Sequence, residues 1–181
     1  MDRRQQKTRM AVFQAFTRLL EKKSFSNISV QEIIDEANIG RSTFYAHFET
    51  KDDLLRALCS EIFDHVFSKH LTKEATHDFS KQQHDLKTEI THILYHLRDS
   101  QSYLKRILSC ESGEMFMRYF KEYLEPVFKG ELAKRPSDIP KDYRLNLMVS
   151  NFAETVRWWM NHKDYTPEDI SSFFFSATPF A

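Results

Sequence analysis

The scarcity of turn residues constrains this chain more than any other feature of its sequence. Only three glycines and five prolines occur among its 181 residues, whereas sixteen phenylalanines and seven tyrosines are present. Strands joined by tight hairpins need many more turn residues than this. Apolar residues instead recur three and four positions apart along most of the chain, which is typical of helices. The sequence therefore predicts an all-α protein of about nine helices.

Length and composition indicate the broad class of the protein. A chain of 181 residues is long enough for two domains, and we expect one over residues 1–50 and another over residues 51–181. The two cysteines form no paired motif, and no apolar stretch resembles a signal peptide or a membrane span. We expect a cytoplasmic protein with reduced thiols and no membrane contact.

Charge is balanced overall but unevenly distributed. Twenty-six basic and twenty-six acidic residues cancel, yet the segment from Met1 to Lys23 holds seven basic residues and only two acidic ones. A basic first helix can lie along the phosphates of nucleic acid, and it can equally be an ordinary solvated helix. Charge alone leaves both interpretations open.

Signals for two short, closely joined helices follow this basic segment. Ser29 and Glu32 have the spacing of a capping box, which marks the start of a helix. Asn38 stands where a helix end commonly adopts the left-handed conformation, and Gly40 can cap the helix that follows. So short a joint predicts a helix-turn-helix.

The second of these helices, expected from Gly40 to Phe48, has an apolar side and a polar side. Phe44 and Phe48 are four residues apart and should face inward. The residues left to face outward are Arg41, Ser42, Thr43, Tyr45 and His47. Arginine can make a bidentate contact to guanine, and the other side chains can reach base edges or phosphates. The pattern suits the major groove of DNA, although it also fits a small three-helix packing unit.

Two segments, Ser29–Ile33 and Gly40–Leu54, together resemble the amino-terminal signature of the TetR family of transcriptional regulators. The resemblance implies a homodimer of all-helical subunits, each with an amino-terminal DNA-binding domain and a carboxy-terminal domain for ligand binding and dimerisation. By position, it implies that bases or nearby phosphates are faced by Gln31, Arg41, Ser42 and Thr43, and that the backbone is held by Tyr45, His47 and Lys51. The family usually has glycine where Asn38 stands and a serine or threonine cap where Gly40 stands.

The resemblance also implies a function. We expect a ligand-responsive repressor that binds a palindromic double-stranded operator, with no enzymatic activity and no cofactor. Symmetric half-sites about 34 Å apart require two copies of the reading helix, hence a homodimer. An alternative within the family is a co-activator that acts through a protein partner.

The last two predicted helices carry more apolar side chains than one buried face needs. They cover about Asp142 to Asn161 and the segment that begins at Thr166. We expect them to form the dimer interface through Val149, Phe152, Val156, Trp159, Ile170, Phe173 and Phe174. The same excess also fits an internal core helix of a monomer.

The aromatic residues of the second domain suggest a pocket for a small apolar or aromatic effector. Its candidate apolar contacts are Tyr95, Tyr103, Phe116, Phe120, Tyr123 and Trp158. Its candidate polar contacts are His96, Arg106, Asn151 and Glu154. We expect the ligand to shift the population of two poses of the preceding helix, which begins near Thr50.

A metal site and an enzyme are the competing interpretations. His92 and His96 are four residues apart, the spacing of two metal ligands on one helix face, so a metal-responsive regulator would follow if a third ligand converged on them. Solvated histidines are the simpler interpretation, and we expect no metal. Because no Gly-rich phosphate loop, nucleophile elbow or paired-cysteine motif is present, the sequence does not indicate an enzyme.

Overall fold

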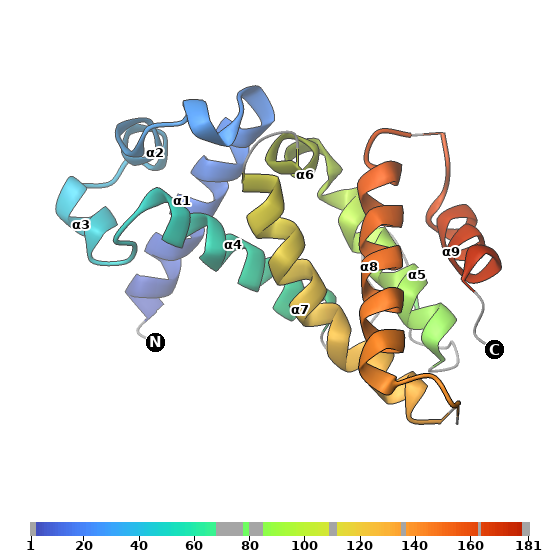
Figure 1. The fold of residues 1–181 in the computed structure, drawn as a ribbon. Helices are drawn as coiled ribbons and strands as arrows, with labels where there is room; N and C mark the ends of the chain where they lie inside the picture. Colours follow the sequence, from blue (N-terminus) through green and yellow to red (C-terminus); the bar gives the residue numbers. More distant parts are fainter. Residues whose placement is uncertain are drawn as a thin grey trace. The chain divides into compact units, whose positions relative to one another are not determined.

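The computed structural model describes residues 3–67, 78–79, 85–108, 112–134, 137–162 and 164–178, and the elements that it contains there are helices (Figure 1). They are α1 (Arg3–Lys22), the 3₁₀ turn η1 (Phe25–Asn27), α2 (Val30–Ala37), α3 (Arg41–Tyr45), α4 (Lys51–Val66), α5 (Leu86–Asp99), α6 (Gln101–Leu108), α7 (Ser112–Leu132), α8 (Lys141–Trp159) and α9 (Pro167–Ala177). The all-α prediction is confirmed. Within the described ranges, none of these helices combines the length and the apolarity needed to cross a membrane.

The helices form two compact units. The first unit consists of residues 1–62 and 102–116, and the second consists of residues 63–101 and 117–181. The division between these compact units falls inside α4, between Ile62 and Phe63, and a domain boundary after residue 50 stays a prediction. Consequently α4 and α7 each continue from one unit into the other.

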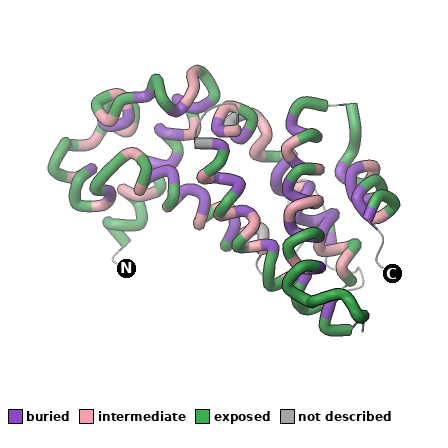
Figure 2. The backbone as a smooth tube through the Cα atoms, viewed as in Figure 1, coloured by how far each residue is buried: buried purple, intermediate pink, exposed green. Residues whose placement is uncertain are grey.

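The core of the first unit is built on one face of α1. Val12 and Phe16 on this face are fully buried, and α1 packs on α2. Figure 2 shows buried and exposed positions alternating along the helices. The ring of Phe16 meets Phe25 edge-on at 6.1 Å, and Phe13 lies 5.9 Å from Phe48. Because the apolar residues share one face, the basic residues of α1 are left on the exposed faces.

Local signals set the two ends of α2 as predicted. Ser29 Oγ accepts from the Glu32 backbone N–H at 3.2 Å, and Glu32 Oε2 accepts from the Ser29 backbone N–H at 2.9 Å, which is a complete capping box. Asn38 adopts the left-handed conformation with φ 51° and ψ 51°, and its N–H reaches the carbonyls of Ile34 and Asp35. The chain thus turns sharply within three residues and is ready to begin α3.

The second unit is built around α8. It packs on α9, which in turn packs on α5, where the Thr91 hydroxyl donates to Ser171 at 3.0 Å. Four fully or almost fully buried rings occupy the centre of the unit, with centroids 5.1–6.1 Å apart: Phe120, Phe128, Phe152 and Phe174. The Trp159 indole N–H donates to the Tyr165 carbonyl at 2.9 Å and ties the end of α8 to the approach to α9.

The hydrogen bonds at Glu32 predict an acid-sensitive start of α2. A bond from Lys23, followed by bonds from the backbone and hydroxyl of Ser29, lowers the pKa of Glu32 to about 2. A depressed pKa stabilises the fold above the carboxyl's unfolded value of about 4.3, and this contribution is lost as the pH falls toward 2. In urea unfolding, Glu32→Gln should lower the midpoint at pH 7, and its difference from wild type should shrink between pH 5 and 2.

The exposed Glu49 provides the matched control. It has no hydrogen bond in the described part of the chain, so Glu49→Gln should leave the unfolding midpoint unchanged at pH 7. A Glu32→Gln midpoint equal to that of wild type at pH 7 would contradict the role given to this capping box.

Candidate nucleic-acid interface

The orientation of α3 is fixed by its apolar side. Phe44 is fully buried and Phe48, which follows the helix, is nearly so, as the sequence predicts, and their ring centroids lie 5.7 Å apart. The polar side chains are consequently turned outward: Arg41, Ser42 and Tyr45 are exposed, and Thr43 and His47 are partly exposed. A compact set of hydrogen-bonding side chains therefore projects from one short helix.

The start of α3 lacks one bond that such helices usually have. Gly40 occupies the cap position with φ −76° and ψ 152°, a conformation that any residue adopts, and no side chain caps the helix there. A Cβ atom at Gly40 would meet Thr43 Oγ1 at 3.6 Å, an ordinary contact. The departure from the family pattern at Gly40 thus removes a cap bond but does not alter the turn.

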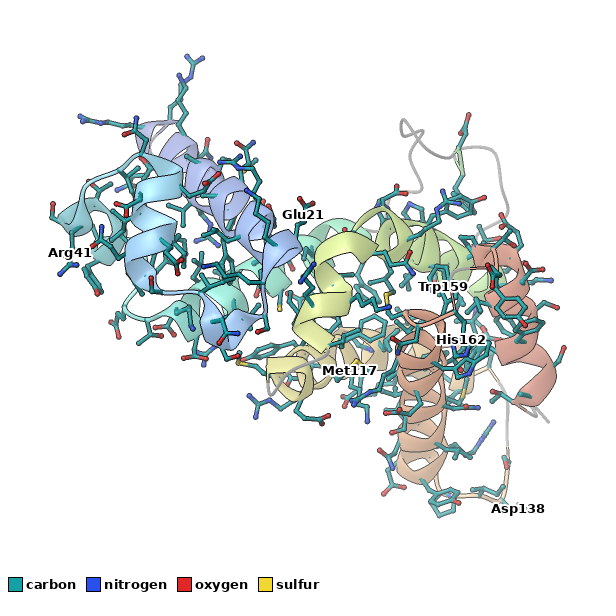
Figure 3. All side chains as sticks on the ribbon, turned by 90° about the horizontal axis from the view of Figure 1, so that it is seen from above. Glu21, Arg41, Met117, Asp138, Trp159 and His162 are labelled. Carbon is teal, nitrogen blue, oxygen red and sulfur yellow. The ribbon has the colours of Figure 1, made fainter. Side chains whose placement is uncertain are left out.

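Arg41 is held by a chain of hydrogen bonds that runs back to α2. Its Nη2 donates to Gln31 Oε1 at 2.6 Å, and Gln31 Nε2 donates to Asp35 Oδ1 at 2.8 Å. All three residues are exposed, and Figure 3 shows Arg41 at the outer edge of the first unit. The structure therefore brings together two of the predicted DNA contacts, Gln31 and Arg41, and adds Asp35, which the sequence did not single out.

Lys51 has a structural role that the sequence did not suggest. Its Nζ donates to the carbonyls of Phe25 at 2.8 Å and Ile28 at 2.7 Å, and it lies 4.4 Å from the centre of the Phe25 ring. These contacts tie the first turn of α4 to the loop before α2. A phosphate contact by Lys51 stays a prediction. For such a contact, the ammonium would have to bind a phosphate oxygen in addition to the two carbonyls.

Part of the positive charge on α1 and directly after it is neutralised within the first unit. Arg18 pairs with Glu36 at 2.7 Å, and Lys23 pairs with Glu32. The guanidinium of Arg9 lies over the ring of Phe13 at 4.9 Å. Further basic residues of α1 are exposed at its start, Arg3, Arg4 and Lys7, and at its end, Lys22, and exposed basic residues can approach a polyanion.

Several of the predicted contacts of an effector, both aromatic and polar, have hydrogen-bond partners within the protein. The Tyr95 hydroxyl donates to Glu168 at 2.6 Å, the Tyr123 hydroxyl to Asp64 at 2.7 Å, and the Asn151 amide to Thr178 at 2.6 Å. Glu154 lies 3.5 Å from Arg157 on the surface. Arg106 belongs to the first unit, whereas the other predicted polar contacts, His96, Asn151 and Glu154, belong to the second.

The predicted aromatic contacts separate into core and surface residues. Phe116 and Phe120 are fully buried, and Phe120 stacks on Phe63 at 5.5 Å. Trp158 is 43% exposed and stacks on His162 at 4.0 Å, so it is a surface residue and not part of an enclosed pocket. The side chain of Tyr103 lies outside the described part of the structure.

A cavity of about 340 Å³ is present in the second unit, but it differs from the pocket that the sequence predicted. It is lined by Asp78, Phe79, Asp85, Lys87, Thr88, Thr91, Tyr95 and Glu168. Tyr95 is the one predicted contact in this lining, and three carboxylates and an ammonium make the lining polar. The expectation of an apolar or aromatic pocket does not describe this cavity.

The prediction for the dimer interface needs correction. Six of its residues lie in the core of the subunit, where a partner cannot reach them: Val149, Phe152, Val156, Trp159, Ile170 and Phe174. Phe173 is 44% exposed and remains a candidate. Exposed large hydrophobic residues elsewhere on α8 and α9 or between them are Tyr143, Leu147, Trp158 and Tyr165.

His92 and His96 form a buried pair, so the expectation of solvated histidines is wrong. Their Nε2 atoms lie 2.9 Å apart, so one ring donates to the other. In the described part of the chain, no group of three or more His, Cys, Asp or Glu side chains is arranged to hold a metal ion. The structure therefore describes these residues as a hydrogen-bonded pair within α5.

Two side-chain contacts could be predicted from spacing in the sequence alone. Gln31 and Asp35 are four residues apart on α2, as are Trp158 and His162 at the end of α8, and side chains at this spacing meet on a helix. Figure 3 shows His162 and Trp159 in the same region of the second unit. The tertiary partner of Gln31, in contrast, had no such signal.

Comparison with known proteins agrees with this architecture. A family model described as "Bacterial regulatory proteins, tetR family" matches residues 13–58, and one described as "Transcriptional regulator C-terminal region" matches residues 84–178, more than half of the chain. A TetR transcriptional regulator from Streptococcus agalactiae 2603V is 32% identical in its solved structure, with a TM-score of 0.75 over 97% of this chain and 96% of that one. The structure of the dihydroxyacetone kinase operon activator DhaS has a TM-score of 0.69 over 94% of this chain and 93% of that one, and at 19% identity it shows the fold alone.

Relatives known from their sequences are also regulators and not enzymes. HTH-type transcriptional regulator SAB2452 of Staphylococcus aureus (strain bovine RF122 / ET3-1) is 25% identical over 77% of this chain and 74% of its own length. HTH-type transcriptional regulator YxbF of Bacillus subtilis (strain 168) is 39% identical over 36% of this chain, which corresponds to 19% of its own length. With both of its parts matched and its helix-turn-helix in place, the chain belongs to the TetR family of DNA-binding transcriptional regulators.

Proposed function

We propose that this regulator is a ligand-responsive repressor that binds a palindromic operator as a homodimer. The observation that carries the proposal is the polar side of α3, where Arg41 projects from a helix held in place by two buried phenylalanines. A helix presented in this way fits the major groove, and its neighbouring helix and flanking residues can hold the phosphates.

The side chains of α3 divide between two tasks. Arg41 reads a guanine through a bidentate contact, and Ser42 and Thr43 are short enough to contact base edges or nearby phosphates. Tyr45 and His47 donate to phosphate oxygens and fix the register of the protein on the duplex. Gln31 stands beside Arg41 and acts together with it.

Dimerisation supplies the second reading helix. We place the interface on an exposed aromatic cluster that begins at the end of α8 and reaches α9. The cluster consists of Trp158, His162, Tyr165 and Phe173. Tyr165 lies 5.5 Å from Trp158 and 5.3 Å from Phe173, so the rings form one continuous apolar surface. Aromatic residues exposed in this way are typical of the centre of a protein–protein interface.

The response to a ligand would pass through α4. At one end Phe63 packs against Phe120 and Tyr123 of α7, with ring centroids 5.5 and 5.2 Å apart. At the other end Lys51 is bound to the loop before α2. An effector that disturbed this packing of Phe63 on α7 would move α4 and, through the bonds of Lys51 to the loop before α2, the helix-turn-helix, which is a shift between two populated poses.

Substitution of Arg41 tests the reading of bases. Arg41→Ala should cost about 1–3 kcal/mol at the preferred operator and relax the preference at one base pair of each half-site. Binding to a panel of operator variants measures both effects. Arg118→Ala, an exposed arginine of the second unit, is the matched control and should bind as wild type does. A uniform loss over all DNA sequences would instead assign Arg41 to the phosphate backbone.

Substitution of Lys51 separates its structural role from phosphate binding. Lys51→Met removes two charged hydrogen bonds and leaves two carbonyls without this donor, so it should lower the free energy of unfolding by about 2–4 kcal/mol. If Lys51 also binds a phosphate, the slope of log K against log salt should fall by about one. The exposed Lys129→Met serves as control, and an unchanged unfolding midpoint for Lys51→Met would refute the structural role.

Substitutions on α8 and α9 test the interface. Trp158→Glu and Phe173→Glu introduce charge at exposed positions and should yield folded monomers that lose operator binding, as measured by sedimentation and helical content. Phe152→Glu should unfold the subunit because its side chain is fully buried. Tyr143→Glu, an exposed position near the start of α8, should remain dimeric. Dimers that survive both Trp158→Glu and Phe173→Glu would place the interface elsewhere.

A further inference from the structure

We propose that Asp35 is a specificity-determining positioning residue, which sets the orientation of Arg41 through Gln31 without touching DNA. This inference rests on the proposed reading of a guanine by Arg41. The three side chains connect α2 to α3 in the order Asp35, Gln31, Arg41, with hydrogen bonds of 2.8 and 2.6 Å.

The chemistry of the three groups permits only one direction for this chain of bonds. A carboxylate only accepts hydrogen bonds and a guanidinium only donates them, whereas an amide has one end of each kind. The amide of Gln31 must therefore turn its NH₂ toward Asp35 and its oxygen toward Arg41, as the structure has it. Arg41 and Asp35 thus fix the orientation of the Gln31 amide together, and Asp35 holds the end of it that Arg41 does not contact.

The bond to Gln31 leaves Arg41 able to read a base. A guanidinium carries five N–H donors. Among the residues that the structure describes, Arg41 uses only Nη2, in its bond to Gln31. Another edge of the guanidinium therefore remains for the two acceptors that guanine presents in the major groove, N7 and O6. Gln31 then accepts a hydrogen bond from Arg41 Nη2, and its role is to orient Arg41 and not to read a base itself.

Preorganisation explains why Asp35 affects specificity more than affinity. An arginine already held in the reading orientation loses less side-chain entropy when it binds its guanine. An unheld arginine can turn toward phosphates or other bases, and these contacts do not distinguish one sequence from another. The negative charge of Asp35, in contrast, weakens binding to every DNA sequence alike.

The test is a selection from a randomised double-stranded DNA library with the full-length protein. Wild type should enrich sites with a guanine preference that Arg41→Ala abolishes. Asp35→Asn, of the same shape, should weaken the preference at that same position about threefold to tenfold, because an amide oxygen accepts a weaker hydrogen bond from Gln31 Nε2 than a carboxylate does, and the new NH₂ can compete with Arg41 for Gln31 Oε1. Asp35→Glu keeps an acceptor and should retain the preference.

Two controls separate this role from charge and from the proposed function. Glu49→Gln removes one negative charge from the same unit and should leave the base preference unchanged. In the Arg41→Ala background, Asp35→Asn should have no further effect on the preference, because Asp35 acts through Arg41.

The outcomes distinguish failure of the role of Asp35 from failure of the proposed role of Arg41. If Arg41→Ala abolishes the preference and Asp35→Asn retains it in full, the positioning role of Asp35 is wrong while the proposed reading by Arg41 stands. If Arg41→Ala selects the same sequences as wild type, or if wild type enriches none, the proposed function of Arg41 fails and the role of Asp35 fails with it.

Discussion

Burial of Phe44 is the contact on which the DNA-binding side of this protein depends. The helix that carries it, α3, has only five residues, and a helix this short is not stable on its own in water. Because Phe44 is fully buried and Phe48 is nearly so, α3 is both stabilised and fixed in its rotation about its own axis. Arg41 and Tyr45 point outward for the same reason. The recognition surface is thus a product of the apolar core of the first unit.

Local signals made the first unit largely predictable from sequence. The capping box at Ser29, the left-handed turn at Asn38 and the inward side of α3 each depend on residues within about four positions of one another, so their spacing alone indicates the structure. The partners of Arg41 and Lys51 were not predicted. They lie ten or more positions away in the sequence, and only the packing of the helices brings them together.

The second unit shows where periodicity stops being informative. An excess of apolar residues in the last two helices correctly indicated that much of α8 and α9 is buried. It could not distinguish burial against other helices of the same subunit from burial against a partner subunit. Trp158 and Trp159 are neighbours in the sequence, yet Trp159 is buried in the subunit and Trp158 lies on its surface. An interface and a core draw on the same residue types, so the predicted interface consisted mostly of core residues. Three of the predicted effector contacts, Tyr95, Tyr123 and Asn151, are hydrogen-bonded to other residues of the second unit, and their spacing in the sequence did not indicate these partners.

The hydrogen-bond chain from Asp35 through Gln31 to Arg41 has a consequence for how such a regulator can diverge. Replacement of the arginine alone would leave the oxygen of Gln31 without its donor, and replacement of the aspartate alone would leave the NH₂ of Gln31 without its acceptor. If Asp35 positions Arg41 as proposed, a change of base preference at this position involves two helices at once, and a duplicated copy of the gene would reach a new preference most readily through paired substitutions in α2 and α3. A single substitution at either residue would pass through an intermediate with a weakened preference at one base pair of each half-site.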